Sequence, residues 1–323
     1  MLKKYYSVSP IPNLKIDSPL HMGDFDIHTT ISKEILEKDY KIDLSIFNYF
    51  EKQMWLNSPI YVRNFSINED KIDFDNAHNA ARAHINHFIN ALVLFQPSIT
   101  YIDRGPLWIF PIPEIKNGPS GKGDFPGLVE VKHHEKLKLG VDEFEEFKIF
   151  FDKCYSYFSK IEKTDLDEYI ENAYYWLTKS RKNIMAYDRL ISLNVLLESL
   201  VGTDQELTHR ISHRCATILG KNSHERGEIY EKIRKYYGQR STILHGSKKI
   251  IANRDLYYLA EIGRTMIIRF VSLAQNDYSQ KRDELMKQLD KAVVDEELRS
   301  EIINQARELF LETADPKFEN NST

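Results

Sequence analysis

In the segment RSTILHG at residues 240–246, Arg240 and His245 stand five residues apart. Arginine holds a phosphate through a planar fork of donors, and histidine is the side chain best suited to move protons near neutral pH. The pair is therefore suited to phosphate chemistry. Arg82 and His87 have the same spacing, which shows that spacing alone is a weak signal.

Arg240 lies on a face of a predicted helix whose other residues are apolar and are expected to be buried. The apolar residues with helical spacing on this face are Ile229, Ile233, Tyr236, Ile243 and Leu244. A charge on such a face is costly unless it is paired. Glu198, in the preceding part of the chain, is the candidate partner that would orient Arg240. The alternative interpretation is a purely structural arginine beside a histidine that caps the helix C-terminus.

The segment from Glu206 to Arg254 is basic, with eleven Lys and Arg against four Asp and Glu, although the whole chain has a net charge of −4. A basic stripe in an acidic protein suggests a polyanionic partner. The candidate contacts to the backbone of such a polyanion are Arg210, Arg214, Lys232, Arg234, Lys248 and Lys249, and Tyr236 and Tyr237 are the candidates for stacking a base if the polyanion is a nucleic acid. The alternative is that these charges only solvate helix surfaces.

The secondary structure predicted around these residues indicates an α+β protein. Residues 1–140 read as a small mixed α/β domain with a regulatory or sensing role. Its predicted strands are 59–67, 71–74, 99–102 and 107–112, and its clearest helix is 77–95. Residues 141–277 read as an all-α, up-and-down bundle, and residues 278–323 as a charged helical extension. The predicted bundle helices are 141–160, 166–180, 183–200, 206–219, 223–244 and 254–275.

Composition limits the class of protein. The chain has 323 residues, of which 42% are hydrophobic and 28% charged, enough for two domains of an ordinary soluble protein. No segment is long and apolar enough to span a bilayer, and no secretory leader is evident. Two cysteines without metal or redox spacing suggest a reducing cytoplasm. We expect no cofactor and no metal site.

The helical half resembles a HEPN domain, most closely the Apea-like HEPN group, over residues 165–275. The resemblance rests on LLESL at 196–200, on ELTHRISHR at 206–214 and on the segment that ends in RSTILHG at 240–246. The family motif is an arginine, a polar residue, three further residues and a histidine near the end of a bundle helix. Ser241 fills the polar place, where asparagine, aspartate or histidine is more familiar.

This resemblance implies a metal-independent endoribonuclease of a toxin or antiviral defence system. RNA carries its own nucleophile, the 2′-OH, so the protein needs only positioning, proton transfer and charge stabilisation. His245 would be the general acid or base, and Arg240 would stabilise the charge on the phosphate, with Glu198 and Ser241 completing the site. The expected products are a 2′,3′-cyclic phosphate and a 5′-OH end.

Helix geometry adds a prediction about assembly. Five residues correspond to about 140° of azimuth in an unbroken helix, so Arg240 and His245 do not share a face. They can serve one phosphate only if the helix unwinds near Gly246 or if two copies meet. The family implies a homodimer with a composite site. The expected partners are thus RNA, a second copy, and a regulatory protein or phage-derived trigger, without a membrane.

Two other functions remain open from the sequence. One is a non-catalytic HEPN module that binds RNA, a nucleotide or a protein partner. The other is a structural, helical dimerisation protein whose N-terminal domain binds an unrelated ligand. Replacing His245 by alanine separates them, because only a nuclease would lose cleavage while it keeps its affinity for RNA.

Overall fold

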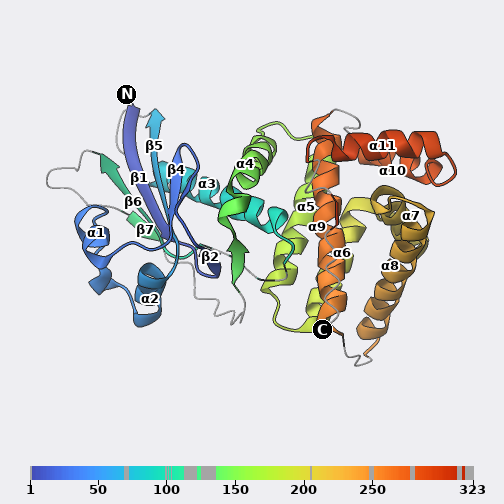
Figure 1. Cartoon of the computed structure of the whole chain (residues 1–323), viewed down its shortest axis with the longest axis horizontal. Coiled ribbons are helices and arrows are strands. Elements are labelled where there is room, and N and C mark those ends of the chain that lie inside the picture. The colour runs from blue at the N-terminus through green and yellow to red at the C-terminus, as the bar shows by residue number, and fades with distance from the viewer. Residues whose placement is uncertain are drawn as a thin grey trace. The chain divides into compact units, whose positions relative to one another are not determined.

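The computed structural model describes residues 2–68, 73–98, 100, 102, 104–112, 122–124, 136–203, 206–246, 251–276, 281–310 and 315–316. The chain forms two compact units, Met1–Gln96 with Thr100–Tyr155 and Pro97–Ile99 with Ser156–Thr323. The first unit contains the sheets and the second is helical (Figure 1), which confirms the predicted α+β class.

The first unit is built on a six-stranded sheet with the order β3-β4-β5-β1-β6-β7. Every pair of neighbouring strands in this sheet is antiparallel. The strands are β1 (Leu2–Pro10), β3 (Leu20–His21), β4 (Phe25–His28), β5 (Ile60–Asn68), β6 (Leu107–Ile112) and β7 (Lys122–Asp124). A separate parallel pair joins β2 (Leu14–Ile16) to β8 (Leu137–Leu139).

Alternation along the strands builds a core on each face of this sheet. On β1, Tyr5 packs with Phe65 beneath α3 (Phe74–Phe95), whereas Val8 faces a core with Trp55 of α2 (Tyr49–Asn57). That second core also includes Leu36 of α1 (Lys33–Lys38). Successive side chains of a strand point to opposite faces, so one strand supplies both cores.

The predicted strands are partly right. The strands at 59–67 and 107–112 are confirmed as β5 and β6, but the strand at 71–74 is wrong, since Phe74 begins α3. Asp73 caps that helix by accepting a hydrogen bond from the backbone of Asp75 at 2.8 Å. Residues 71, 72, 99 and 101 lie outside the described residues, and residues 100 and 102 are not in a strand.

The boundary between the units lies beyond residue 140. Most of α4 (Phe144–Phe158) belongs to the first unit. Its aromatic face packs on α3, and the rings of Phe147 and Phe88 are 5.7 Å apart. The predicted boundary is therefore corrected by about one helix, because this aromatic stripe completes the core of the sheet unit.

The second unit is a bundle around α9. Its helices are α5 (Asp165–Lys182), α6 (Ala186–Val201), α7 (Leu207–Leu219), α8 (Ser223–Leu244), α9 (Asn253–Gln275), α10 (Arg282–Lys291) and α11 (Glu296–Glu308). Every residue of α9 from Leu259 to Ala274 is buried, and the helix lies against α5, α6, α7 and α11. A β-carbon at Gly263 would come within 2.9 Å of Leu196, so glycine allows α6 to approach closely.

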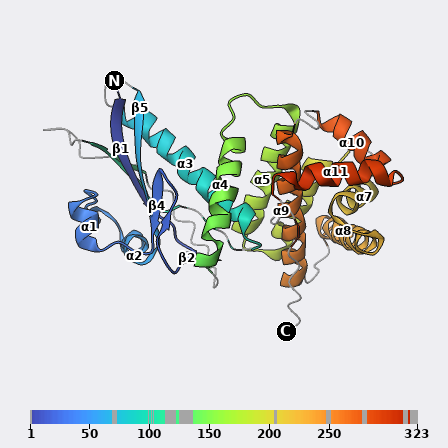
Figure 2. The same ribbon diagram turned by 45° about the horizontal axis from the view of Figure 1, so that its top comes forward.

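The predicted C-terminal extension is part of this bundle. Leu285 and Leu289 of α10 and Ile302 of α11 are buried, and both helices pack on α7. Residues 278–323 are therefore not a separate extension where they are described. Figure 2 shows α10 and α11 beside α7 and α9. None of the described helices is both long and apolar enough to cross a membrane.

Buried arginines close the C-terminal ends of α6 and α7. The last carbonyls of a helix have no partner within it, and cations are favoured there. The contacts run from Arg214 to Val201 at 2.6 Å, from Arg282 to Leu200 at 3.1 Å, from Arg299 to Thr217 at 3.2 Å, and from Arg269 to Ile218. Several basic residues of this unit thus have a structural role.

Candidate functional site

Helix α8 carries the candidate site at its C-terminal end. Asn222 caps its first turn by accepting from the Glu225 backbone at 2.9 Å, and Ile229, Ile233 and Tyr236 are buried, as their spacing predicts. The predicted stripe ends there, because Leu244 is 57% exposed. The candidate residues therefore lie where the buried face of α8 gives way to solvent.

Arg240 is ion-paired with Glu198 of α6. Its Nη2 lies 3.2 Å from Glu198 Oε1 and 3.4 Å from Oε2, and the two side chains are 22% and 20% exposed. The expected pairing of the two residues is therefore present. It holds the guanidinium at the rim of the bundle, where solvent reaches part of it.

Tyr237 joins these two residues into one cluster. Its hydroxyl donates to Glu198 Oε1 at 2.6 Å and accepts from Arg240 Nη1 at 3.3 Å, and the Arg240 guanidinium carbon lies 5.3 Å from the ring centroid. Burial and the bond to Glu198 raise the pKa of Tyr237 well above 10, so the hydroxyl keeps its proton. Tyr237 is buried and positions Arg240, which corrects its predicted role in base stacking.

The guanidinium of Arg240 is not fully satisfied. Its Nε is buried and has no hydrogen-bond partner among the described residues. Buried polar groups in proteins are nearly always paired, and the exceptions concentrate where a ligand, a water molecule or catalysis supplies the partner. Arg240 thus has donor capacity beyond Glu198 and Tyr237.

His245 ends α8 as its C-cap residue. Its backbone N–H donates to the Ser241 carbonyl at 3.1 Å, and Gly246 follows with φ of +88°. The imidazole is exposed and has no hydrogen-bond partner among the described residues. A left-handed glycine at this position is a common helix ending.

The helix does not unwind between the two candidate residues. It is regular to Leu244, so Arg240 and His245 keep the azimuthal difference of about 140° and a rise of about 7.5 Å. Unwinding of the helix near Gly246, one of the two predicted ways to bring Arg240 and His245 to one phosphate, is therefore not observed. Ser241 is exposed on the same turn, and its side chain makes no hydrogen bond or ion pair in the part of the chain that the structure describes.

Arg214 is a core residue rather than a surface contact for RNA. Its side chain is 1% exposed, and its Nε and Nη2 each lie 2.7 Å from the carboxylate of Asp290 on α10. Arg210 shares this carboxylate, with its Nη1 at 2.8 Å. Burial alone would raise the pKa of Asp290, but hydrogen bonds and charge from Arg214 and Arg210 lower it below 3.8. The prediction that Arg214 binds RNA is corrected.

Some of the other residues predicted to contact RNA are exposed and some are buried. Tyr236 is buried and donates to Asp255 at 3.0 Å, so it cannot stack a base. Lys232 and Arg234 are exposed on α8, with the Lys232 ammonium 4.2 Å from the Tyr258 ring centroid. The predicted residues Lys248 and Lys249 lie outside the described residues. Exposed cations therefore remain on α8, but fewer than the sequence predicts.

A small hollow lies near the opposite end of α8. It has a volume of about 250 Å³ and is lined in part by His213, Arg226, Tyr230 and Arg299. The rings of His213 and Tyr230 are 4.8 Å apart. Arg226 precedes His245 by nineteen residues, or about 28 Å of helix. This hollow is thus separate from the Arg240 cluster.

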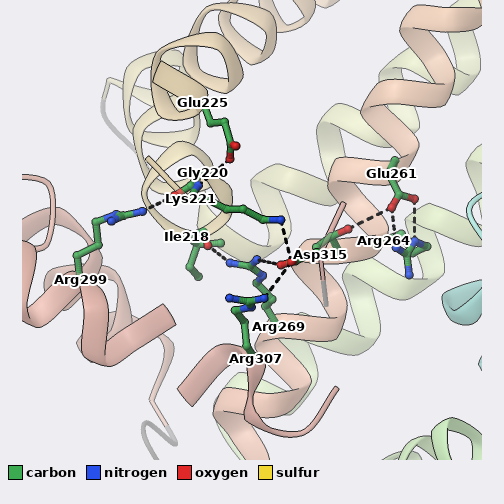
Figure 3. Close-up of polar contacts among 11 residues, drawn as sticks. Ile218, Gly220, Lys221, Glu225, Glu261, Arg264, Arg269, Arg299, Arg307 and Asp315 are labelled. Carbon is green, nitrogen blue, oxygen red and sulfur yellow. Dashed lines mark hydrogen bonds and ion pairs between the residues drawn. The ribbon is translucent and has the colours of Figure 1, made fainter. Parts of the chain in front are cut away.

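Sequence reasoning missed the carboxylates that organise this unit. Asp290 pairs with Arg214, and Asp315 contacts Lys221, Arg269 and Arg307 (Figure 3). No local spacing connects an aspartate to an arginine 76 positions away. The i,i+4 spacing of Arg210 and Arg214 places both on one helix face, which was the one usable signal. Among the described residues, no group of three or more His, Cys, Asp or Glu is placed to hold a metal ion.

Comparison with protein-family models, curated proteins and solved structures found no match to this chain. The resemblance to HEPN domains therefore stays a prediction from the sequence. We infer function from the residues and from the geometry of the Arg240 cluster.

Proposed function

We propose that the protein is a metal-independent endoribonuclease of HEPN type. The 2′-OH of RNA attacks the adjacent phosphorus, the bond to the 5′-oxygen breaks, and the products are a 2′,3′-cyclic phosphate and a 5′-OH end. His245 transfers the proton from the 2′-OH or to the leaving oxygen. Arg240 stabilises the negative charge that develops on the phosphate.

The main support for this proposal is the environment of the Arg240 guanidinium. Glu198 and Tyr237 fix its guanidinium at a rim that is open to solvent, and one buried donor lacks a partner among the described residues. An oriented, incompletely paired arginine lies within about 8 Å, along one helix, of an exposed histidine. These are the residue types that phosphodiester transfer requires.

The separation of the two residues favours a site shared between two copies. Because α8 stays helical to Leu244, His245 faces away from Arg240 of its own chain. Leu244, the residue directly before His245, is a large apolar side chain that is 57% exposed. Exposed apolar surface of this kind favours contact with another protein surface. We therefore propose a homodimer in which Arg240 of one chain meets His245 of the other.

A ribonuclease of this kind requires restraint in the cell. We assign that role to the first unit, which would sense a regulatory protein or a phage-derived trigger, as in a toxin or antiviral defence system acting in the cytoplasm. This assignment follows from the need for control and from the separate core of the first unit.

The test is cleavage of total RNA and tRNA in EDTA by the purified full chain. We expect wild-type protein to leave cyclic phosphate and 5′-OH ends, and His245→Ala to cleave about 10²–10⁴-fold more slowly. His224→Ala is the matched control, because His224 is also exposed and lies on the first turn of the same helix. Equal cleavage by wild type and His245→Ala would refute the assignment.

A second candidate, a non-catalytic module that binds RNA or nucleotide, is favoured by one contact. The carboxylate of Glu198 lies 3.2 Å from Arg240 and neutralises part of its charge, which weakens stabilisation of a transition state but leaves the Arg240 Nε as a hydrogen-bond donor to a bound phosphate. For such a module, neither wild type nor His245→Ala cleaves RNA, and both bind it with the same affinity. Measuring RNA affinity beside cleavage therefore separates the two functions.

A further inference from the structure

The small hollow near the N-terminal end of α8 is built by four helices of the second unit. Figures 1 and 2 both show α7 and α8 side by side, and α10 and α11 pack on α7. Two side chains come from each of α7, α8 and the turn between α10 and α11: His213 and Thr217, Gly227 and Tyr230, Ala292 and Val293. Elements far apart in the sequence thus enclose one space.

The hollow has the size and the wall of a site for one flat ring system. Its volume of about 250 Å³ exceeds the ~150 Å³ of a cavity that holds benzene, and it is below the ~300 Å³ at which sites for larger ligands begin. The wall is mostly apolar, and the rings of His213 and Tyr230, with centroids 4.8 Å apart, form part of it. A wall of this kind is suited to a planar aromatic group.

Two polar side chains of the wall lack partners. The imidazole of His213 and the hydroxyl of Thr217 form no hydrogen bond or ion pair with any described residue. Burial and the charge of His209 lower the pKa of His213 below 6.5, against the opposing charge of Asp290, so the ring is neutral at pH 7. A neutral imidazole and a hydroxyl each offer one donor and at least one acceptor. Together they can bind the polar edge of a base.

The charged side chains of the wall are already paired. Arg299 Nη1 lies 2.5 Å and Arg226 Nη1 3.3 Å from the carboxylate of Glu296. Arg299 also donates to the Thr217 carbonyl at 3.2 Å and to the Gly220 carbonyl. The group that enters the hollow therefore needs no charge of its own, which favours a base over a phosphate.

The hollow lies on the same face of α8 as His245. Gly227 and His245 are eighteen residues apart, which at ~100° and ~1.5 Å per residue is five full turns and about 27 Å. Arg234 lies within about 20° of the line that joins them. Its side chain is 60% exposed, and its ion pair with Glu231, at 4.0 Å, is a weak surface pair. A polyanion along this face would therefore pass an exposed cation between the hollow and His245.

We propose that the hollow is a docking site for an unpaired base of single-stranded RNA. The base packs on the rings of Tyr230 and His213 and bonds through its edge to His213 and Thr217, while the backbone follows α8 past Arg234 to His245. At ~3.4 Å per stacked nucleotide, about eight nucleotides span the distance. The substrate class is thus single-stranded RNA, because a paired base cannot leave its helix without loss of pairing. This inference rests on the proposed cleavage of RNA at His245.

The experiment measures binding of the full chain to two probes of ten nucleotides, long enough to reach from the hollow to His245. One probe is 2′-O-methyl oligoadenylate, whose blocked 2′-oxygen cannot attack the phosphate, and the other is the same backbone without bases. The Kd of the probe without bases, divided by that of oligoadenylate, measures what the bases contribute. Gly227→Leu should lower this ratio about tenfold, the effect of losing one stacked base, because an apolar side chain fills the hollow.

Gly238→Leu is the matched control. Both glycines are exposed on α8, and a β-carbon at either position meets nothing within 4 Å, so both variants should fold. Leucine at 238 lies on the same face of α8 but outside the hollow, so it should affect both probes alike and leave the ratio at the wild-type value. Tyr230→Leu keeps an apolar side chain but removes the ring, and it should lower the ratio as Gly227→Leu does. Thermal unfolding checks that each variant is folded.

An unchanged ratio in both Gly227→Leu and Tyr230→Leu overturns the docking site, and so does a wild type that binds neither probe. Cleavage of unmodified RNA by wild type and by His245→Ala is measured separately. A ratio that falls in a protein without cleavage activity keeps the docking site and rejects the nuclease. Cleavage that depends on His245, together with an unchanged ratio, keeps the nuclease and rejects the docking site.

Discussion

The composite site makes a quantitative prediction about mixing two inactive variants. Arg240→Ala and His245→Ala each remove one half of the proposed pair. In a homodimer whose sites take Arg240 from one chain and His245 from the other, a heterodimer of the two variants keeps one site with both residues. Its second site lacks both. Two inactive proteins should therefore produce an active one when they share a dimer.

The expected activity follows from counting sites. A purified heterodimer has one intact site of two, so its rate per dimer should be about half that of wild type. Random exchange between equal amounts of the variants gives half heterodimers, and the mixture should reach about one quarter. Each variant alone should be slower by about 10²-fold or more.

The assay co-expresses the two variants with different affinity tags and isolates the heterodimer by two purification steps. Cleavage is then compared with that of each homodimer at equal concentration. The stability of each variant must be measured alongside its cleavage activity. His245→Ala removes an exposed side chain and should change the free energy of unfolding by less than about 0.5 kcal/mol. Arg240→Ala loses its contacts with Glu198 and Tyr237 and should cost about 1–2 kcal/mol.

A folded heterodimer that is as inactive as its parents would refute the reasoning from helix geometry. It would mean that Arg240 and His245 do not meet across two chains. If the chain is monomeric at the assay concentration while the wild type still cleaves RNA, the composite site is rejected as well. Rate loss in both variants without complementation would leave only a site within one chain, which needs α8 to change shape near Gly246.

Three further predictions concern single residues of the second unit. Asp290→Asn should cost about 2 kcal/mol in urea unfolding at pH 7, since it strands the buried Arg214 but Asp290 itself is 36% exposed; because the pKa of Asp290 is lowered on folding, wild type should lose this advantage progressively as the pH falls below about 4 and through the lowered pKa, so the difference in stability should be smaller at pH 3 than at pH 7. Tyr237→Phe should cost about 1 kcal/mol and slow RNA cleavage, because the 2.6 Å bond to Glu198 is lost; an unchanged cleavage rate would count against its positioning role. Gly246→Ala should lower stability by about 1 kcal/mol in thermal unfolding, purely from backbone strain at φ +88°, because an added β-carbon meets nothing within 4 Å.

The helices of the second unit could be predicted because their signals are local. The bounds of α8 (Ser223–Leu244) agree with its apolar period, with Asn222 before it and with Gly246 after it. Strand β1 was missed for the opposite reason. It has polar residues on both faces, and its place in the middle of the sheet depends on β5 and β6, which follow much later in the chain. Pairing of this kind is not encoded in any short window.

The roles of single residues were less predictable than the elements that carry them. An arginine that binds RNA and an arginine that closes a helix end have the same local sequence signature. For Arg214 the difference is made by Asp290, 76 positions later, and for Tyr236 by Asp255, 19 positions later. Charge patterning therefore identified the basic segment 206–254 but could not say which of its cations face solvent.

Arg240 shows where physical reasoning from sequence succeeds. A charge on an apolar face needs a partner, and Glu198 provides it. Stability alone does not explain such a pair, since replacing a buried ion pair by apolar residues of similar volume is often neutral or stabilising. The cluster is also only partly buried, and it keeps a donor without a partner in the described structure. An arrangement that holds a guanidinium in a fixed orientation at the rim, about one and a half turns before an exposed histidine, is what we expect of a site that binds an anion.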